Sequence, residues 1–148
     1  MTAREYLERP ETIRREIGRK RMRIGTLRRL ATRFSAEPSP VRVRSTPDPT
    51  RMQAFLAEAA DEEQEILRLE EQRHQAFADA ALLISRLPEE KMARIMEMRY
   101  LDLLPWEEIT DRMGISASHV YRLHQLALEI LTPPPEFPEE TENLRCNL

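Results

Sequence analysis

The chain has 148 residues, of which only three are glycine and 33% are charged, a composition that favours long, polar-faced helices over β-structure. Its net charge is −3, and its single cysteine, Cys146, excludes an internal disulfide and a cysteine-rich zinc site. No apolar run approaches the length of a membrane span, so we expect a cytoplasmic protein with no membrane partner.

The charge is distributed unevenly along the chain. Residues 1–44 hold 13 Arg/Lys and 5 Asp/Glu, whereas residues 45–90 hold 4 and 11. A basic block beside an acidic block indicates either mutual pairing or a surface for nucleic acid.

The first expected helix covers residues 3–34 and begins with the capping box Thr2-Ala3-Arg4-Glu5. Apolar or small residues follow with heptad spacing at Ala3, Tyr6, Pro10, Ile13, Ile17, Ile24, Leu27, Ala31 and Phe34. Lys20 interrupts this seam, and Pro10 is expected to bend the helix or to restart it. Residues 35–50 contain four prolines and no periodicity, so they are expected to form a linker. A second apolar seam, interrupted by Glu62 and Arg73, predicts a helix over residues 50–87. It consists of Met52, Phe55, Ala59, Ile66, Leu69, Ala76, Ala80, Leu83 and Leu87.

The two helices together predict a long antiparallel, coiled-coil-like hairpin that makes residues 1–87 one domain. If Phe34 faces Met52, each apolar residue of the first seam lies opposite an apolar residue of the second seam along the whole hairpin. The flanking residues then pair Arg23 with Glu65 and Arg21 with Glu63. Exposed ion pairs of this kind contribute little stability, so we expect them to select the register of the hairpin.

Residues 88–131 predict a helix followed by a helix-turn-helix. The apolar positions that two crossed helices need are occupied by Ile109, Met113, Ile115, Val120 and Leu123. Gly114 stands where the turn requires a positive φ, and Ser116 is placed to cap the second helix. Such a second helix can lie in the major groove, so double-stranded DNA is the expected partner. Residues 132–148 are rich in proline and glutamate and are expected to be disordered.

The remaining polar residues show no catalytic constellation, so we expect neither an enzyme nor a cofactor or metal site. The three histidines are scattered, and no phosphate-binding loop is present. His124 is expected to be a partly buried helix residue or, alternatively, a phosphate contact. Trp106 is expected to be a packing anchor.

The C-terminal motifs resemble region 4 of bacterial sigma factors. The residues that carry this resemblance are Arg99-Tyr100-Leu101, Trp106-Glu107-Glu108-Ile109, Gly114-Ile115-Ser116, Val120, Leu123, Ala127, Leu128 and Leu131. Over residues 2–131 the chain is similar to small prophage-encoded, sigma-region-4-like proteins of Gram-positive bacteria. The implied fold is all-α, a long helical hairpin followed by a sigma region 4-like helix-turn-helix.

The resemblance implies a phage or prophage transcription regulator that acts with RNA polymerase or as a homo-oligomer. It places the DNA-binding positions at Ser116, Ala117, Ser118, His119, Tyr121, Arg122 and Gln125. Two alternatives remain open. Small terminase subunits of phage DNA-packaging machines also join a helix-turn-helix to long helices, and a helical adaptor that binds no DNA would suit the weak basicity of residues 91–131.

Overall fold

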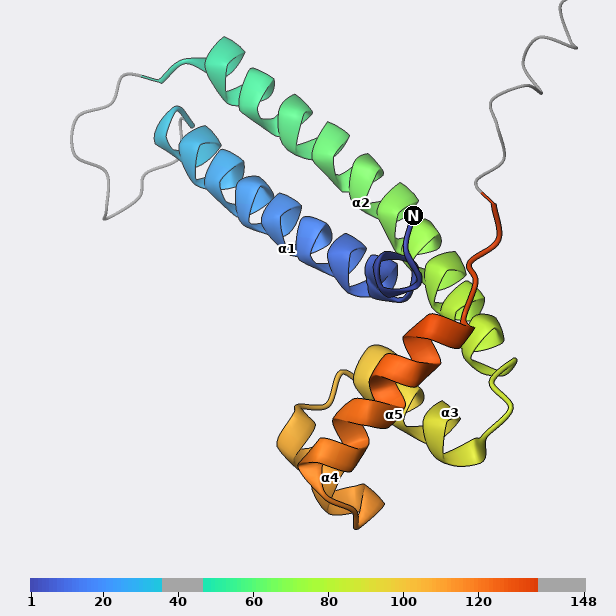
Figure 1. Ribbon diagram of the computed structural model, residues 1–148. Helices are drawn as coiled ribbons and strands as arrows, with labels where there is room; N and C mark the ends of the chain where they lie inside the picture. Colours follow the sequence, from blue (N-terminus) through green and yellow to red (C-terminus); the bar gives the residue numbers. More distant parts are fainter. Residues whose placement is uncertain (36–46, 136–148) are drawn as a thin grey trace, which may run out of the picture. The chain divides into compact units, whose positions relative to one another are not determined.

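The computed structural model describes residues 1–35 and 47–135, and every regular element in those ranges is a helix (Figure 1). The order of elements is α1 (Ala3–Arg33), α2 (Pro49–Ile84), α3 (Glu90–Met96), the π-helical turn η1 (Glu97–Leu101), α4 (Trp106–Met113) and α5 (Ala117–Ile130). The predicted all-α class is confirmed: two long helices precede a set of short ones. None of the described helices is both long enough and apolar enough to span a membrane.

The helices form two compact units. The hairpin unit comprises residues 9–76, and the C-terminal unit comprises residues 1–8 together with the chain from residue 77 onward. The expected linker and the expected tail fall largely on residues 36–46 and 136–148, which lie outside the described residues.

Helix α1 begins with the predicted capping box. The Thr2 backbone N–H donates to the Glu5 carboxylate at 2.7 Å, and the Glu5 N–H donates to Thr2 Oγ1 at 3.2 Å. The hydrogen bonds that the Glu5 carboxylate accepts from Thr2 lower the pKa of Glu5. The helix then continues through Pro10 to Arg33, so the expectation that Pro10 restarts the helix is wrong. Buried residues on both sides of Pro10, Leu7 and Ile17, hold the backbone helical despite the missing donor.

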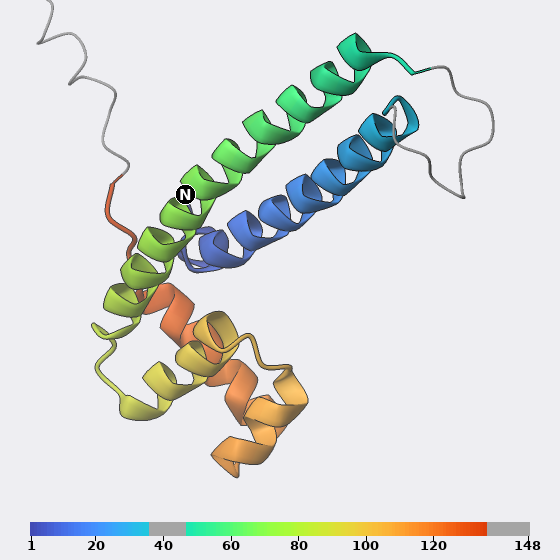
Figure 2. The ribbon, with the colours of Figure 1, turned by 180° about the vertical axis from the view of Figure 1, so that it is seen from behind.

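The hairpin unit places α1 and α2 side by side and antiparallel (Figures 1 and 2). Its core contains only residues of the two predicted seams: Ile17, Ile24, Leu27, Ala59, Ile66 and Leu69, with Ile13 and Phe55 packed against them. Near the C-terminal end of α1 and the N-terminal end of α2, the rings of Phe34 and Phe55 stack with their centroids 5.9 Å apart. Apolar periodicity therefore identified the buried faces correctly.

The predicted ion pairs at the flanks of the hairpin are wrong in detail. Arg23 donates to Glu58 at 2.5 Å and lies 3.8 Å from Glu62, while Arg21 donates to Glu70 at 3.0 Å. Glu65 binds Arg68 of its own helix instead. A long arginine side chain can extend diagonally along the neighbouring helix. It can therefore pair with any of several carboxylates and not only with the one directly opposite.

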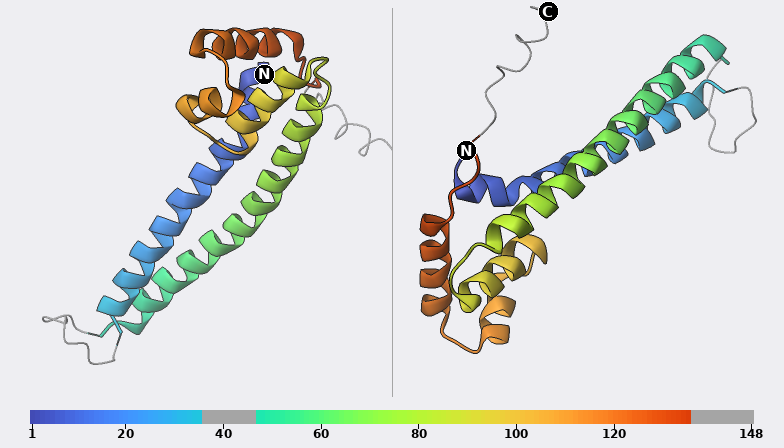
Figure 3. Two further views of the ribbon diagram at one scale, coloured as in Figure 1. Left: turned by 90° about the horizontal axis from the view of Figure 1, so that it is seen from below. Right: turned by 90° about the vertical axis from the view of Figure 1, so that its right-hand side faces the viewer.

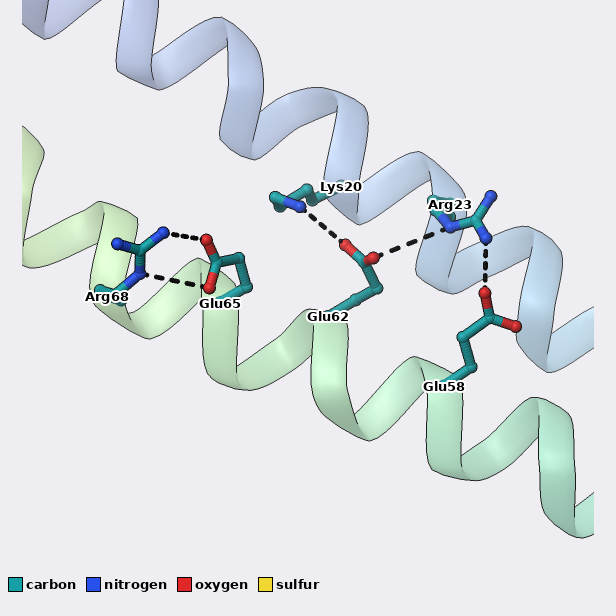
Figure 4. A network of polar contacts seen from close by, with 6 residues as sticks. All are labelled: Lys20, Arg23, Glu58, Glu62, Glu65 and Arg68. Carbon is teal, nitrogen blue, oxygen red and sulfur yellow. Dashed lines mark hydrogen bonds and ion pairs between the residues drawn. The ribbon is translucent and has the colours of Figure 1, made fainter.

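Two of the three polar residues that interrupt the seams, Lys20 and Glu62, contact each other (Figure 4), whereas Arg73 lies 3.6 Å from Glu70 of its own helix. The Lys20 ammonium lies 3.0 Å from the Glu62 carboxylate, and their side chains are 23% and 21% exposed. Arg23 approaches the other oxygen of the same carboxylate (Figure 4). Lys20 and Glu62 thus form one half-buried ion pair in the hairpin.

The C-terminal unit has its own core, and the two ends of the long helices contribute to it. Tyr6 and Leu7 from the start of α1 and Ala80 and Ile84 from the end of α2 belong to the same cluster as Ile95. Residues 1–8 and 77–87, assigned from sequence to the hairpin domain, therefore pack with the short helices. The boundary lies at residues 8/9 and 76/77 rather than after residue 87, because the long helices supply apolar residues to two separate cores.

Candidate nucleic-acid interface

Helices α4 and α5 are joined by a short turn and form a helix-turn-helix (Figure 3). Gly114 ends α4 in the left-handed conformation, with φ 67° and ψ 25°, and its N–H donates to the carbonyl of Thr110. Ser116 caps α5, since its Oγ accepts the N–H of His119 at 3.2 Å. The sequence correctly predicted both the glycine that ends α4 and the serine that caps the start of α5.

The inward faces of α4 and α5 pack together as the apolar spacing predicted. Ile109, Val120, Leu123 and Ala127 are all buried in the core of the C-terminal unit. Thr110 is half-buried, and its hydroxyl donates to the Trp106 carbonyl of the preceding turn at 2.9 Å. These contacts fix which side of α5 faces away from α4.

The predicted DNA-binding residues gather on the first turns of α5 and its cap. Tyr121 is 61% exposed, and Arg122 is exposed beside it. The complete set divides into exposed Ser116, Ala117, Ser118, Tyr121 and Arg122, and half-buried His119 and Gln125. The helix thus presents these side chains together outside the core. Their contact with DNA stays a prediction.

His124 lies on α5 one turn after Val120 and is only 3% exposed. Its Nε2 is 2.7 Å from the hydroxyl of Tyr100, and its ring meets the Trp106 ring edge-on at 4.7 Å between centroids. The imidazole is therefore buried inside the C-terminal unit, with Nε2 held by the Tyr100 hydroxyl. The alternative that His124 contacts a phosphate is therefore wrong, and Trp106 is the packing anchor that the sequence suggested.

The buried imidazole is held in its neutral form. Burial, reinforced by the positive charges of Arg4 and Arg99, lowers the pKa of His124 to about 4. Burial also raises the pKa of Tyr100. Within the described residues, His124 Nδ1 has no hydrogen-bond partner, so the Tyr100 hydroxyl is the one polar contact of this ring.

Sequence reasoning missed the π-helical turn that positions Tyr100 opposite His124. The same turn carries Arg99, whose guanidinium lies 4.5 Å from the centre of the Trp106 ring and donates to the Leu104 carbonyl at 3.2 Å. Leu103, between them, adopts a positive φ of 55°. The motif Arg99-Tyr100-Leu101 was visible in the sequence, but its apolar spacing indicates an ordinary helix, since no periodicity signals one wide turn.

The charge around the candidate interface is mixed. Helix α4 has three acidic residues, Glu107, Glu108 and Asp111, and its one basic residue, Arg112, pairs with Glu108 at 2.7 Å. Across the part of the chain that the structure describes, no hydrogen bond or ion pair engages Arg122. No group of three metal-ligating side chains occurs in the described ranges. Arg122 is therefore the available cation beside the exposed turns of α5.

The family comparison agrees with this geometry. Residues 83–131 match the family model described as sigma-70, region 4. The match includes all of α3, η1, α4 and α5, so these elements are similar to region 4, a family of DNA-binding helix-turn-helix domains. The resemblance noted from the sequence is confirmed for these residues. The chain matches no curated protein and no solved structure.

Proposed function

We propose that the protein is a DNA-binding transcription regulator that reads base pairs through the first turns of α5. The observation that carries this proposal is the exposed surface of Ala117, Ser118, Tyr121 and Arg122 on a region 4 helix-turn-helix. In such a motif the N-terminal residues of the second helix enter the major groove.

The residue types suggest distinct contacts. Arg122 can donate two hydrogen bonds to a guanine edge, which is worth about 1–3 kcal/mol of discrimination. Ser118 and Tyr121 suit phosphate or single-bond contacts, and Ala117 can meet a thymine methyl. His119 and Gln125 are half-buried and lie at the margins of this surface.

Residues 91–131 hold five Arg/Lys and six Asp/Glu, and this lack of net positive charge suggests that the domain does not act alone. Phosphate neutralisation supplies much of the affinity of most DNA-binding proteins, yet α4 presents acidic residues beside the one free cation of α5. We infer that RNA polymerase or a second copy of the chain contributes further contacts. A prophage-encoded regulator in the bacterial cytoplasm, as the sequence resemblance implies, fits this dependence.

Binding-site selection from random duplexes tests the proposal with the full chain. Arg122→Ala is expected to relax the preference at one or two base pairs and to leave the helical circular dichroism unchanged. Arg112→Ala is the matched control, because it removes an exposed arginine that is already paired on α4. An unchanged motif and affinity for Arg122→Ala would refute base reading by α5.

A second candidate is a helical adaptor that binds another protein and not DNA. The exposed apolar residues Leu126 and Ile130, one turn apart on α5, favour it, as does the acidic surface of α4. Failure of the full chain to select any duplex would place this candidate first.

A further inference from the structure

The exposed surface of α1 in the hairpin unit carries an excess of positive charge that α2 does not neutralise. Residues 9–33 hold ten Arg/Lys and two Asp/Glu, whereas residues 49–76 hold three and seven. Both acidic residues of this part of α1, Glu11 and Glu16, are half-buried, so all of its fully exposed charged residues are basic.

Some of these cations are engaged within the unit. Lys20, Arg21, Arg23 and Arg28 each contact a carboxylate of α2. Arg14 holds Glu11 through two hydrogen bonds of 2.7 Å. The internal pairing predicted from the sequence is thus present, but it accounts for one side of α1 and not for the other.

The other side of α1 forms what we call the arginine stripe, defined by Arg15, Arg19 and Arg29. Arg15 is 3.7 Å from Glu11, which Arg14 already binds more closely. Arg29 donates only to the hydroxyl of Thr26 at 3.1 Å, and within the described ranges no carboxylate contacts Arg19 or Arg29. All three side chains are exposed.

The spacing of the arginine stripe keeps it on one face of the helix. Positions 15, 19, 22, 26 and 29 follow each other at intervals of four and three residues, the repeat of an α-helix. Met22, at the centre, is 76% exposed. At 1.5 Å per residue the stripe is about 21 Å long. It is a straight row of cations interleaved with uncharged side chains.

The ligand that suits such a row is a polyanion with closely spaced phosphates. Guanidinium groups match phosphate oxygens in a bidentate manner and are only weakly hydrated. Double-stranded DNA offers one negative charge for about every 1.7 Å of its axis, so a stripe of this length can face several phosphates at once.

We propose that the arginine stripe of α1 is a second, sequence-independent contact surface for the DNA backbone. The choice of DNA rests on the proposed function, because a DNA-binding helix-turn-helix on the same chain brings duplex within reach. The stripe would supply phosphate contacts that the acidic α4 and the single free cation of α5 do not.

The test measures binding of the full chain to a random-sequence duplex from about 50 to about 200 mM KCl by fluorescence anisotropy. Replacing Arg15, Arg19 and Arg29 by Gln is expected to reduce the slope of log affinity against log salt by about 2.7, since each lost phosphate contact removes about 0.9. The control replaces Arg51, Arg68 and Arg73 of α2 by Gln, which removes the same charge from the other helix. Circular dichroism verifies that both variants remain helical.

An equal slope for the stripe variant and wild type would overturn the proposal, and so would an equal fall in both variants. Tighter, stripe-dependent binding to phosphatidylserine vesicles than to duplex would overturn it in favour of a membrane surface. A stripe variant that loses slope while still selecting the wild-type motif supports it. If the slope falls although the wild type selects no motif, this surface stands and base reading by α5 fails.

Discussion

Removing the Tyr100 hydroxyl tests whether the buried contact with His124 holds the helix-turn-helix together. In Tyr100→Phe the ring stays, but His124 Nε2 loses the partner that lies 2.7 Å away. His124 Nδ1 is already without a partner among the described residues, and the ring is buried, so neither nitrogen could find water without opening the core. Leaving a buried polar atom unsatisfied costs about 1–3 kcal/mol.

The assay is urea unfolding followed by the fluorescence of Trp106, the only tryptophan in the chain. Its ring is 4.7 Å from that of His124, so the signal reports on the C-terminal unit and not on the hairpin. The matched control is Tyr121→Phe, which removes a hydroxyl from an exposed ring of the same helix-turn-helix. The free energy of unfolding should fall by about 1–3 kcal/mol for Tyr100→Phe and by less than about 0.5 kcal/mol for the control. Equal losses would show that the hydrogen bond is not a structural element of the domain.

Three further outcomes follow from the geometry. Burial lowers the pKa of His124 to about 4 from an unfolded value of about 6.5. The C-terminal unit should therefore keep its full stability above about pH 6.5 and lose on the order of 3 kcal/mol as the pH falls to 4. The same unfolding assay, followed by Trp106 fluorescence, should show no such loss for His124→Gln. Gly114→Ala should cost about 1–2 kcal/mol in the same assay and Gly114→Asn less, because no atom lies within 4 Å of an added Cβ and only the positive φ penalises it; equal costs would contradict this. Glu62→Gln should lower the thermal midpoint of the hairpin by circular dichroism, through a loss of about 1 kcal/mol, whereas replacing both Lys20 and Glu62 by Met should restore it.

The buried faces of the long helices could be predicted because apolar periodicity is a local property of the sequence. The same holds for the caps: Thr2, Gly114 and Ser116 act within three or four residues of themselves. The ion pairs could not be predicted, because Arg23 reaches two carboxylates of α2 and the sequence does not say which it selects. Apolar periodicity and capping residues thus predict the helices, but they do not predict which charged side chains form ion pairs between the helices.

The division into two units was missed for a related reason. The periodicity of α1 passes from Tyr6 to Ile17 without a break, although Tyr6 packs with the short helices and Ile17 packs with α2. A continuous seam shows that a helix has one buried face. It does not show that a single neighbour covers that face from end to end.

The candidate site divides in the same way. The exposure of Tyr121 and Arg122 follows from the inward positions of Val120 and Leu123, so the sequence predicted it. The partner of His124 lies 24 residues away on a π-helical turn, and no local signal connects the two. Polar contacts between distant elements are the part of the site that required the structure.

This contact bears on function through the rotation of α5 about its axis. Apolar packing by Val120, Leu123 and Ala127 is non-directional and tolerates small rotations, whereas the hydrogen bond of His124 to Tyr100 has a fixed direction. Successive residues of a helix are about 100° apart, so a rotation by one position would turn Arg122 from the outside toward α4. The hydrogen bond of the buried imidazole therefore adds a directional restraint to the apolar packing that turns the proposed base-reading side chains outward.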